Sequence, residues 1–169
     1  LLADLALHEL DVILTDAPAS SYVKVKAFNH LLGECDIVFL GRDEAVAEIK
    51  MNFPSSLDNA PVILPSENTA LRRALDHWFE ENGIRPQIRG EFEDNALLNA
   101  YGQAGMGFFP AASIIVDEVM SQYQLVSAGT LPEVKQRFYA VTVERKVVHP
   151  AAVAICHEAS RILSRGAEA

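Results

Sequence analysis

The residues of this chain best suited to chemistry form an acidic cluster, in which Glu91, Glu93, Asp94 and Asn95 lie close together in the sequence. Carboxylate and amide oxygens are the ligands that hard cations prefer, so a cation site is one interpretation. Acidic residues before a helix also stabilise its N-terminus, which would make Glu93 or Asp94 a helix cap. A third role is pH sensing, because neighbouring carboxylates raise each other's pKa values. The sequence leaves these three roles open.

Polar residues also begin the segment from Ser66, where Ser66, Asn68 and Thr69 precede an amphipathic pattern. The free backbone N–H groups and the positive end of a helix dipole would make such a start an anion-binding site. Ser66 or Asn68 could instead serve as the N-cap residue, and the two roles are compatible. We therefore retain Ser66, Asn68 and Thr69 as candidate ligand-binding residues.

Two further groups of candidates follow short apolar runs. Thr15, Asp16 and Ser20 come at or after the end of a first run, and Pro110 follows the run "GFF". Ligands of open α/β sheets bind outside the carboxyl ends of the strands, so these residues are expected to line a cleft. For Thr15, Asp16 and Ser20 the alternative is a loop with ordinary Asx and serine turns.

The glycines Gly102, Gly105 and Gly107 resemble a nucleotide-binding loop in composition only. A dinucleotide fingerprint needs the spacing G-x-G-x-x-G directly after a strand, so that backbone N–H groups meet the phosphates. Here the spacing is G-x-x-G-x-G, after a predicted helix and before a predicted strand. We interpret the stretch as a helix end with glycines in left-handed geometry, and we predict no cofactor.

The remaining reactive side chains do not predict a catalytic or metal site. The histidines are not spaced as a ligand set and are interpreted as structural or surface residues: His8, His30, His77, His149 and His157. Cys35 and Cys156 lack the C-x-x-C spacing of a zinc site, and we expect both thiols to be reduced. No G-x-S-x-G or H-E-x-x-H motif occurs in the sequence. We therefore predict that the chain is not an enzyme.

The composition bounds the class of protein. Half of the 169 residues are hydrophobic, which predicts a globular chain with a sizeable core. The chain has 14 basic and 23 acidic residues, a net charge of −9, and its basic residues are scattered. Such a surface would repel a nucleic-acid backbone, so this part alone is not expected to bind DNA. No apolar run reaches the roughly 18 residues of a membrane span, so we expect no membrane contact and a cytoplasmic location.

The elements that must position these residues alternate between helices and strands. Apolar patterns predict helices near residues 2–6, 66–83, 95–103, 111–122 and 149–166, and strands near 10–16, 23–32, 34–41, 60–65, 85–92, 105–110, 125–129 and 137–144. Leu71, Leu75, Trp78 and Phe79 share one face of the second helix, and Gly83 marks its end. This alternation predicts an α/β fold with mostly parallel sheets, and strand 10–16 is expected to be buried and parallel.

The order of several motifs resembles the effector-binding domain of LysR-type transcriptional regulators. These motifs are "LLADLALHELDVILTDAP", "PSENTALRRALDHWFEENGI", "ALLNAYGQAGMGFFP" and "RFYAVTVERKVVHPAAVAICHEASRIL", and they cover nearly the whole chain. The stretches "GECDIVF", "IRGEFEDNALLNAYG" and "ERKVVHPAAVAIC" are similar to the branch of that family that contains the activator of sodium/proton antiporter genes.

That resemblance implies a type II periplasmic-binding-protein-like fold, in which two Rossmann-like lobes are joined by crossover strands. Residues 1–32 and 141–169 would form lobe I, and residues 33–140 would form lobe II. The first β-α-β of lobe I and the DNA-binding winged helix-turn-helix of the family would lie upstream of Leu1. Lobe I is therefore expected to be N-terminally truncated.

The function that the resemblance implies is effector sensing. A small molecule or an ion would bind in the cleft between the lobes, and the branch suggests Na⁺, with Glu91, Glu93 and Asp94 as candidate ligands. The regulator would be a homodimer or homotetramer and would reach DNA only through the upstream domain. The alternative is a solute-binding protein of transport, or an enzyme, on the same fold. The order of the motifs and the missing catalytic set favour the regulator.

Overall fold

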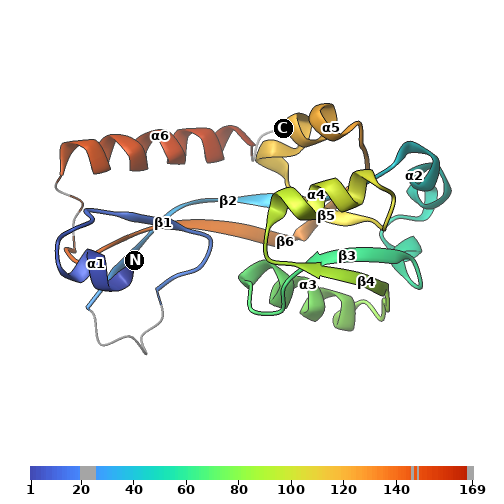
Figure 1. Cartoon of the computed structure of the whole chain (residues 1–169), viewed down its shortest axis with the longest axis horizontal. Helices are drawn as coiled ribbons and strands as arrows, with labels where there is room; N and C mark the ends of the chain where they lie inside the picture. The colour runs from blue at the N-terminus through green and yellow to red at the C-terminus, as the bar shows by residue number, and fades with distance from the viewer. Residues whose placement is uncertain (20–25, 146, 148, 167–169) are drawn as a thin grey trace. The chain divides into compact units, whose positions relative to one another are not determined.

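The computed structural model describes residues 1–19, 26–145, 147 and 149–166. The chain forms two compact units: unit 1 comprises Leu1–Cys35 and Arg137–Ala169, and unit 2 comprises Asp36–Gln136. The chain crosses between the units within strands β2 (Phe28–Gly41) and β6 (Val126–Thr142), which appear as long ribbons in Figure 1. The lobe boundaries expected from the sequence, at residues 32/33 and 140/141, also lie inside these two strands.

Unit 1 contains helix α1 (Leu2–Ala6), strand β1 (Ile13–Thr15) and helix α6 (Pro150–Gly166), together with parts of β2 and β6. Strand β1 pairs antiparallel with β6, and Leu14 faces Ala140. The prediction of a buried parallel strand at residues 10–16 is therefore wrong. In the sheet order β1-β6-β2-β5, strand β1 is an edge strand, and the side chain of Leu14 is 52% exposed. A short apolar run does not distinguish an edge strand from a central one.

Helix α6 packs closely on β2 within unit 1. A Cβ atom on Gly33 would lie 2.7 Å from the Cβ of Leu163, so only glycine allows this approach. Leu163 and Ala152 are buried on α6, and Leu5 is buried on α1. Two ion pairs flank the point where β2 and β6 pass from one unit to the other. Glu34 accepts from Arg137 at 3.0 Å in unit 1, and Asp36 pairs with Lys135 in unit 2.

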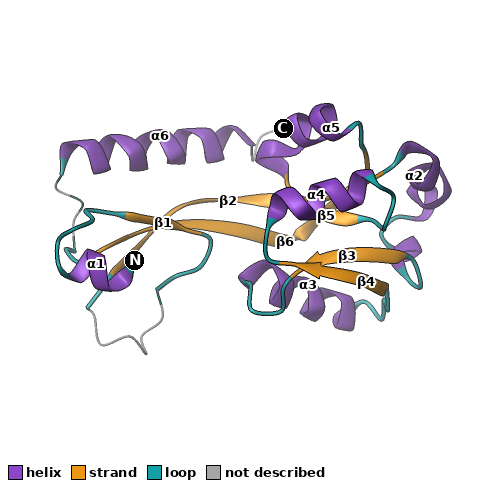
Figure 2. Cartoon of the chain, in the orientation of Figure 1, coloured by secondary structure: helices purple, strands orange, loops and turns teal. Residues whose placement is uncertain are grey.

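Unit 2 alternates strands and helices, coloured by type in Figure 2. In chain order its complete elements are α2 (Asp43–Ile49), the 3₁₀ turns η1 (Lys50–Asn52) and η2 (Ser55–Leu57), β3 (Pro61–Pro65), α3 (Ala70–Glu81), β4 (Gln87–Phe92), α4 (Asn95–Gln103), β5 (Phe109–Ala112), η3 (Ser113–Ile115) and α5 (Val116–Tyr123). Strands β3 and β4 are parallel, whereas β2 and β5 are antiparallel. A parallel bridge joins Val62 of β3 to Phe108. Both parallel and antiparallel strand pairs thus occur, and the prediction of mostly parallel sheets does not hold.

The core of unit 2 lies on both faces of its strands. Side chains alternate across a strand, so Ile37 and Phe39 of β2 point to one face and Val38 and Leu40 to the other. Helix α3 covers the first face with Leu75, Trp78 and Phe79, all buried. Helices α4 and α5 cover the second face with Leu98 and Val119. Figure 1 shows α3 and α4 on opposite sides of β3 and β4. The apolar stripe of α3 is therefore core.

Strands β2 and β6 are each continuous, although the sequence predicted two shorter strands in each region. The predicted strands left gaps at Gly33 and at residues 130–136, yet Gly33 lies inside β2 and Pro132 lies exposed inside β6. A strand accepts a proline where its missing N–H is not needed by a neighbour. Helix α2 was not predicted. Within the part of the chain that the structure describes, no helix combines the length and the apolar character needed to cross a membrane.

Candidate functional site

Two neighbouring parallel strands of unit 2 end beside the starts of two helices. Strand β3 ends at Pro65 and leads into α3, and β4 ends at Phe92 and leads into α4. The backbone N–H of Ser66 donates to the carbonyl of Phe92 at 3.0 Å, so the two loops are joined directly after the strands. We call residues 66–69 and 93–95 the strand-end loops. They contain five of the candidate residues: Ser66, Asn68, Thr69, Glu93 and Asp94.

The N-cap of helix α3 is Thr69. Its hydroxyl donates to the carbonyl of Ser66 at 2.9 Å and accepts from the backbone N–H of Arg72 at 3.2 Å. The sequence assigned the cap to Ser66 or Asn68, and that assignment is wrong because the helix begins at Ala70, later than predicted. Asn68 is exposed, and its carbonyl accepts from the side chain of Arg73 at 2.8 Å. The hydroxyl of Thr69 thus satisfies the backbone N–H of Arg72, one of the N–H groups that the first turn of a helix leaves unpaired.

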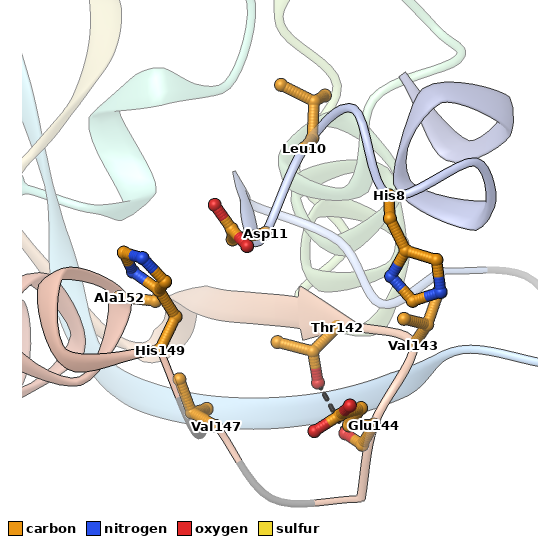
Figure 3. Close-up of a pocket in the computed structure, with 9 residues that line it drawn as sticks. All are labelled: His8, Leu10, Asp11, Thr142, Val143, Glu144, Val147, His149 and Ala152. Carbon is orange, nitrogen blue, oxygen red and sulfur yellow. Dashed lines mark hydrogen bonds between the residues drawn. The ribbon is translucent and has the colours of Figure 1, made fainter.

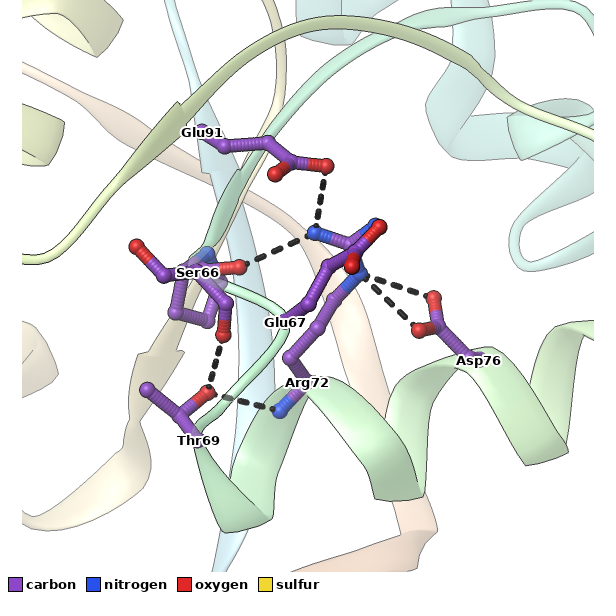
Figure 4. A network of polar contacts seen from close by, with 7 residues as sticks. Ser66, Glu67, Thr69, Arg72, Asp76 and Glu91 are labelled. Atoms are coloured by element: carbon purple, nitrogen blue, oxygen red, sulfur yellow. Dashed lines mark hydrogen bonds and ion pairs between the residues drawn. The ribbon is translucent and has the colours of Figure 1, made fainter.

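Arg72 is the centre of a polar network behind these loops (Figure 4). Its side chain is 4% exposed, although it is charged. Nη1 donates to the carbonyl of Pro65 at 3.1 Å and to Glu91 Oε1 at 2.8 Å, and Nε donates to both carboxylate oxygens of Asp76. Nη2 lies 3.9 Å from Glu67. Three carboxylates thus surround one guanidinium.

Burial and hydrogen bonding act on the pKa of Arg72 in opposite directions. Removal of the guanidinium from water lowers the pKa, and the hydrogen bonds to Asp76 and Glu91, with the attraction of both carboxylates, raise it above its ordinary value. The guanidinium therefore stays charged, and its burial is compensated by partners, as a buried charge requires.

The acidic cluster of the sequence is divided among separate tasks. Glu91 accepts from Arg72, whereas Asp94 caps α4, with Oδ1 accepting from the backbone N–H of Leu97 at 3.0 Å. The prediction that Glu93 or Asp94 caps this helix is confirmed for Asp94. Glu93 is exposed. In residues 1–19, 26–145, 147 and 149–166, no three His, Cys, Asp or Glu side chains gather in a way that could hold a metal ion. Cation binding and pH sensing by the cluster stay predictions.

The other candidates lie elsewhere. Thr15 ends β1 in unit 1, and its Oγ1 accepts from the N–H of Ala17 at 3.3 Å, while Asp16 is exposed. Ser20 lies outside the described residues. Pro110 does not follow its strand, as predicted, but lies buried within β5 opposite Phe39. The first residue after β5 is Ser113, whose buried Oγ has no hydrogen-bond partner among the described residues. Ligand contacts by Thr15, Asp16, Ser20 and Pro110 stay predictions.

The glycine-rich turn serves packing and chain reversal. Gly105 has a φ of +83°, the left-handed conformation expected of a glycine after a helix. Gly107 approaches the backbone of Pro61 so closely that a Cβ atom would lie 2.8 Å from its carbonyl oxygen. A Cβ on Gly102 would collide with the ring of Phe109. Left-handed geometry was predicted for the glycines as a group, and of these three it holds for Gly105 alone.

A small cavity of about 80 Å³ lies within unit 1 (Figure 3). Its lining includes two imidazoles and two carboxylates, from residues that are far apart in the sequence: His8, Asp11, Glu144 and His149. Thr142 also lines it and is buried; its hydroxyl donates to the carbonyl of Glu144 at 2.6 Å. Because that bond uses the only hydroxyl proton, His30 Nε2, at 2.9 Å, must be the donor to Thr142 Oγ1. Sequence spacing gave no signal for this cavity.

Residues 1–161 match the family described as "LysR substrate binding domain". The "Transcriptional activator protein NhaR" of Escherichia coli (strain K12) is 30% identical over 157 residues, which are 93% of this chain and 51% of the relative; the protein of the same name from Shigella flexneri matches equally. The chain thus spans about half the length of the curated relatives it matches.

Solved structures show the same fold at low sequence identity. The reduced regulatory domain of OxyR2 from Vibrio vulnificus has a TM-score of 0.71 at 13% identity, with 98% of this chain and 76% of that chain covered. The effector domain of AmpR of Pseudomonas aeruginosa has a TM-score of 0.67 at 17% identity, with 98% and 77% covered. The CcmR regulatory domain of Synechocystis PCC6803, in complex with 2-PG, has a TM-score of 0.65 at 14% identity, with 95% and 77% covered. The α/β, type II periplasmic-binding-protein-like fold is confirmed.

Proposed function

This chain belongs to the LysR substrate-binding domain family, the effector-binding domains of LysR-type transcriptional regulators, and we propose that it senses Na⁺ or another small ligand for an activator of sodium/proton antiporter genes. The family match over residues 1–161 carries the proposal. The 30% identity to NhaR supports an activator. Members of the family bind effectors and are not enzymes; we propose the same for this chain.

The strand-end loops of unit 2 are the proposed part of the ligand site within that unit. They lie at the carboxyl ends of two parallel strands, where α/β sheets bind ligands. Their polar groups include the exposed carboxylates of Glu93 and Asp94 and the side chains of Ser66, Asn68 and Thr69. Thr15, Asp16, Ser20 and Pro110 remain proposed contacts, and Glu91 with Glu93 and Asp94 remain proposed Na⁺ ligands.

The ligand would act through a difference in affinity between two arrangements of the regulator, because a ligand that binds both equally shifts neither. We propose that the regulator is a homodimer or homotetramer in the cytoplasm. Contact with DNA is assigned to a winged helix-turn-helix outside this sequence, because the net charge of −9 disfavours direct contact.

A thermal-shift series tests the proposal. Chloride salts of Na⁺, Li⁺ and K⁺ at equal ionic strength, and a set of small carboxylates, are added to the 169-residue chain. A ligand at a hundred times its Kd stabilises the folded state by about 2.7 kcal/mol, so a specific stabiliser stands out from a general salt effect. We expect Na⁺ to raise the melting temperature more than K⁺.

Two substitutions test whether the Na⁺-dependent rise in melting temperature arises at the strand-end loops. Glu93→Gln removes an exposed charge, and Asp94→Asn removes a charge but keeps the cap, because Asn caps a helix as well as Asp does. Glu80→Gln, on an exposed position of α3, is the matched control. We expect the Na⁺ response to weaken in the first two variants only. Equal stabilisation of the parent chain by Na⁺ and K⁺ would refute a sodium site. Selective stabilisation by one of the small carboxylates would instead identify that carboxylate as the ligand.

A further inference from the structure

We propose that Arg72 is the positioning residue of the strand-end loops: it holds the starts of helices α3 and α4 in one fixed arrangement without itself binding the ligand. Its effect on ligand binding rests on the proposed function, since these loops are the proposed ligand site of unit 2. The mechanical part of the inference rests on the network of Figure 4 alone.

The hydrogen bonds of Arg72 join three separate segments. The carbonyl of Pro65 belongs to the end of β3, Glu91 belongs to β4, and Asp76 belongs to α3. The bonds to Pro65 and Glu91 fix residues within two positions of a strand-end loop, and the bonds to Asp76 fix the side chain of Arg72 against the middle of α3. The two loops share one further link, the backbone bond from Ser66 to Phe92. That bond holds the strands side by side, whereas the side chain of Arg72 also ties both of them to the body of helix α3.

The shape of the guanidinium suits this task. Its Nε and Nη1 donate in fixed directions to partners on opposite sides, as shown in Figure 4. A lysine in its place has one flexible ammonium group and could not keep the same fork. A buried arginine whose partners are lost would leave a charge without compensation, so the bonded arrangement is favoured strongly over an open one.

The network also withholds Arg72 from ligands. Its Nε and Nη1 donate to protein acceptors, and Nη2 faces Glu67 at 3.9 Å. Glu67, Asp76 and Glu91 together outweigh its single positive charge. An anionic ligand would have to displace a carboxylate to reach the guanidinium. Arg72 therefore acts on ligand binding through the loops that it orders.

Amide hydrogen exchange on the 169-residue chain tests this role. The variants are Arg72→Lys, which keeps the charge but loses the fork, and Glu91→Gln, which weakens one branch of the network. Arg85→Lys is the matched control, because Arg85 is an exposed arginine outside the strand-end loops. Exchange is compared between residues 66–71, residues 93–98 and the buried strand residues Val62 to Leu64.

We expect Arg72→Lys to speed exchange in both loop segments by about tenfold or more relative to β3, the factor that corresponds to a lost hydrogen bond of a charged group. Glu91→Gln should speed exchange after β4 more than at the start of α3, and Arg85→Lys should change neither. Exchange that rises equally in the loops and in β3 would show a general contribution to stability and overturn the inference. Unchanged exchange of both loop segments in Glu91→Gln would also overturn the inference, and this result decides the question if Arg72→Lys does not fold.

A binding measurement separates the two proposals. NaCl and KCl titrations follow the melting temperature of the parent chain and of Arg72→Lys, which changes no proposed Na⁺ ligand. Absence of any selective response in the parent chain would count against the proposed sodium ligand, while the exchange pattern would still decide the role of Arg72. A selective response that persists unchanged in Arg72→Lys, despite loosened loops, would show that the loops are ordered by Arg72 but do not bind the ion, and it would overturn the link to ligand binding.

Discussion

Gly102 of helix α4 lies against the ring of Phe109 of strand β5, so closely that a Cβ atom on Gly102 would be 2.1 Å from Cε1 of Phe109. Real Cβ atoms do not approach other atoms to that distance, and Phe109 is completely buried in the core between α4 and the strands. The helix can therefore rest on β5 only where it has no side chain. This contact gives Gly102 a packing role within the glycine-rich stretch.

Gly102→Ala should destabilise the chain by about 1–3 kcal/mol, because the added methyl group overpacks a filled core. The measurement is the free energy of unfolding in urea. Phe109→Leu in the same chain should recover part of the loss, since the smaller side chain leaves room, and a double-mutant cycle would report that coupling. Gly83→Ala is the control: nothing lies within 4 Å of its Cβ position, so only its positive φ contributes to the change. A cycle with no coupling would contradict the contact.

Thr69→Ala should cost about 1 kcal/mol of stability, because the N–H of Arg72 loses the hydroxyl that caps it. Thr69→Ser should retain most of that stability. Asn68→Ala provides the comparison, because helix α3 is capped by Thr69, and because Asn68 accepts from the side chain of Arg73 through its backbone carbonyl, which alanine keeps. Urea unfolding of the three variants distinguishes the residues. A larger loss at Asn68 than at Thr69 would contradict the observed cap.

Thr142→Val should destabilise unit 1, because the hydroxyl of Thr142 serves as donor to Glu144 and as acceptor from His30. Loss of buried hydrogen bonds at one site costs about 1–3 kcal/mol. Thr142→Ser keeps the hydroxyl and should be close to the parent chain. Urea unfolding curves, followed by near-ultraviolet circular dichroism, measure the effect. Equal stability of the valine and serine variants would mean that the hydroxyl bonds contribute nothing.

Cys156 should react with iodoacetamide in the folded chain more slowly than an exposed thiol, because burial raises its pKa and so reduces the thiolate fraction. Cys35 is buried and should react only after unfolding. A thiol whose folded pKa is raised contributes stability that is present below its unfolded pKa and is lost as the pH rises through the folded pKa. Stability should therefore fall in the alkaline range, and less so in Cys156→Ser. Mass spectrometry of the alkylated peptides measures both rates.

Where a pattern is local, the sequence predicted the structure well. The spacing of Leu75, Trp78 and Phe79 identified α3 and its buried face, and Gly83 marked its end with a φ of +66°. Asp94 was predicted as one of two possible caps of α4, and it is the cap. These features depend on residues within a few positions of one another, so the sequence contains the information directly.

Features that depend on residues far apart in the sequence were not predicted, or were predicted wrongly. Arg72 is a charged residue next to the apolar face of a helix, and one of the carboxylates that compensate its burial, Glu91, lies nineteen positions later in the sequence. The predicted strands left a gap at Gly33, but this residue allows helix α6 to lie on β2. The cavity of unit 1 gathers His8 with Thr142 and His149, from opposite ends of the sequence. None of these contacts has a signature in local spacing.

The backbone passes from unit 1 to unit 2 in β2 and returns in β6, and this order affects how the chain folds during synthesis on the ribosome. All of unit 2 lies in one uninterrupted segment, from Asp36 to Gln136, and can fold as soon as that segment has emerged. The first 35 residues emerge earlier but have to wait, because the other half of unit 1 begins only at Arg137. During that interval Leu5, which is buried in the finished unit, is without its complete core, and strand β1 is without its partner strand β6, so this segment is open to chaperones and proteases.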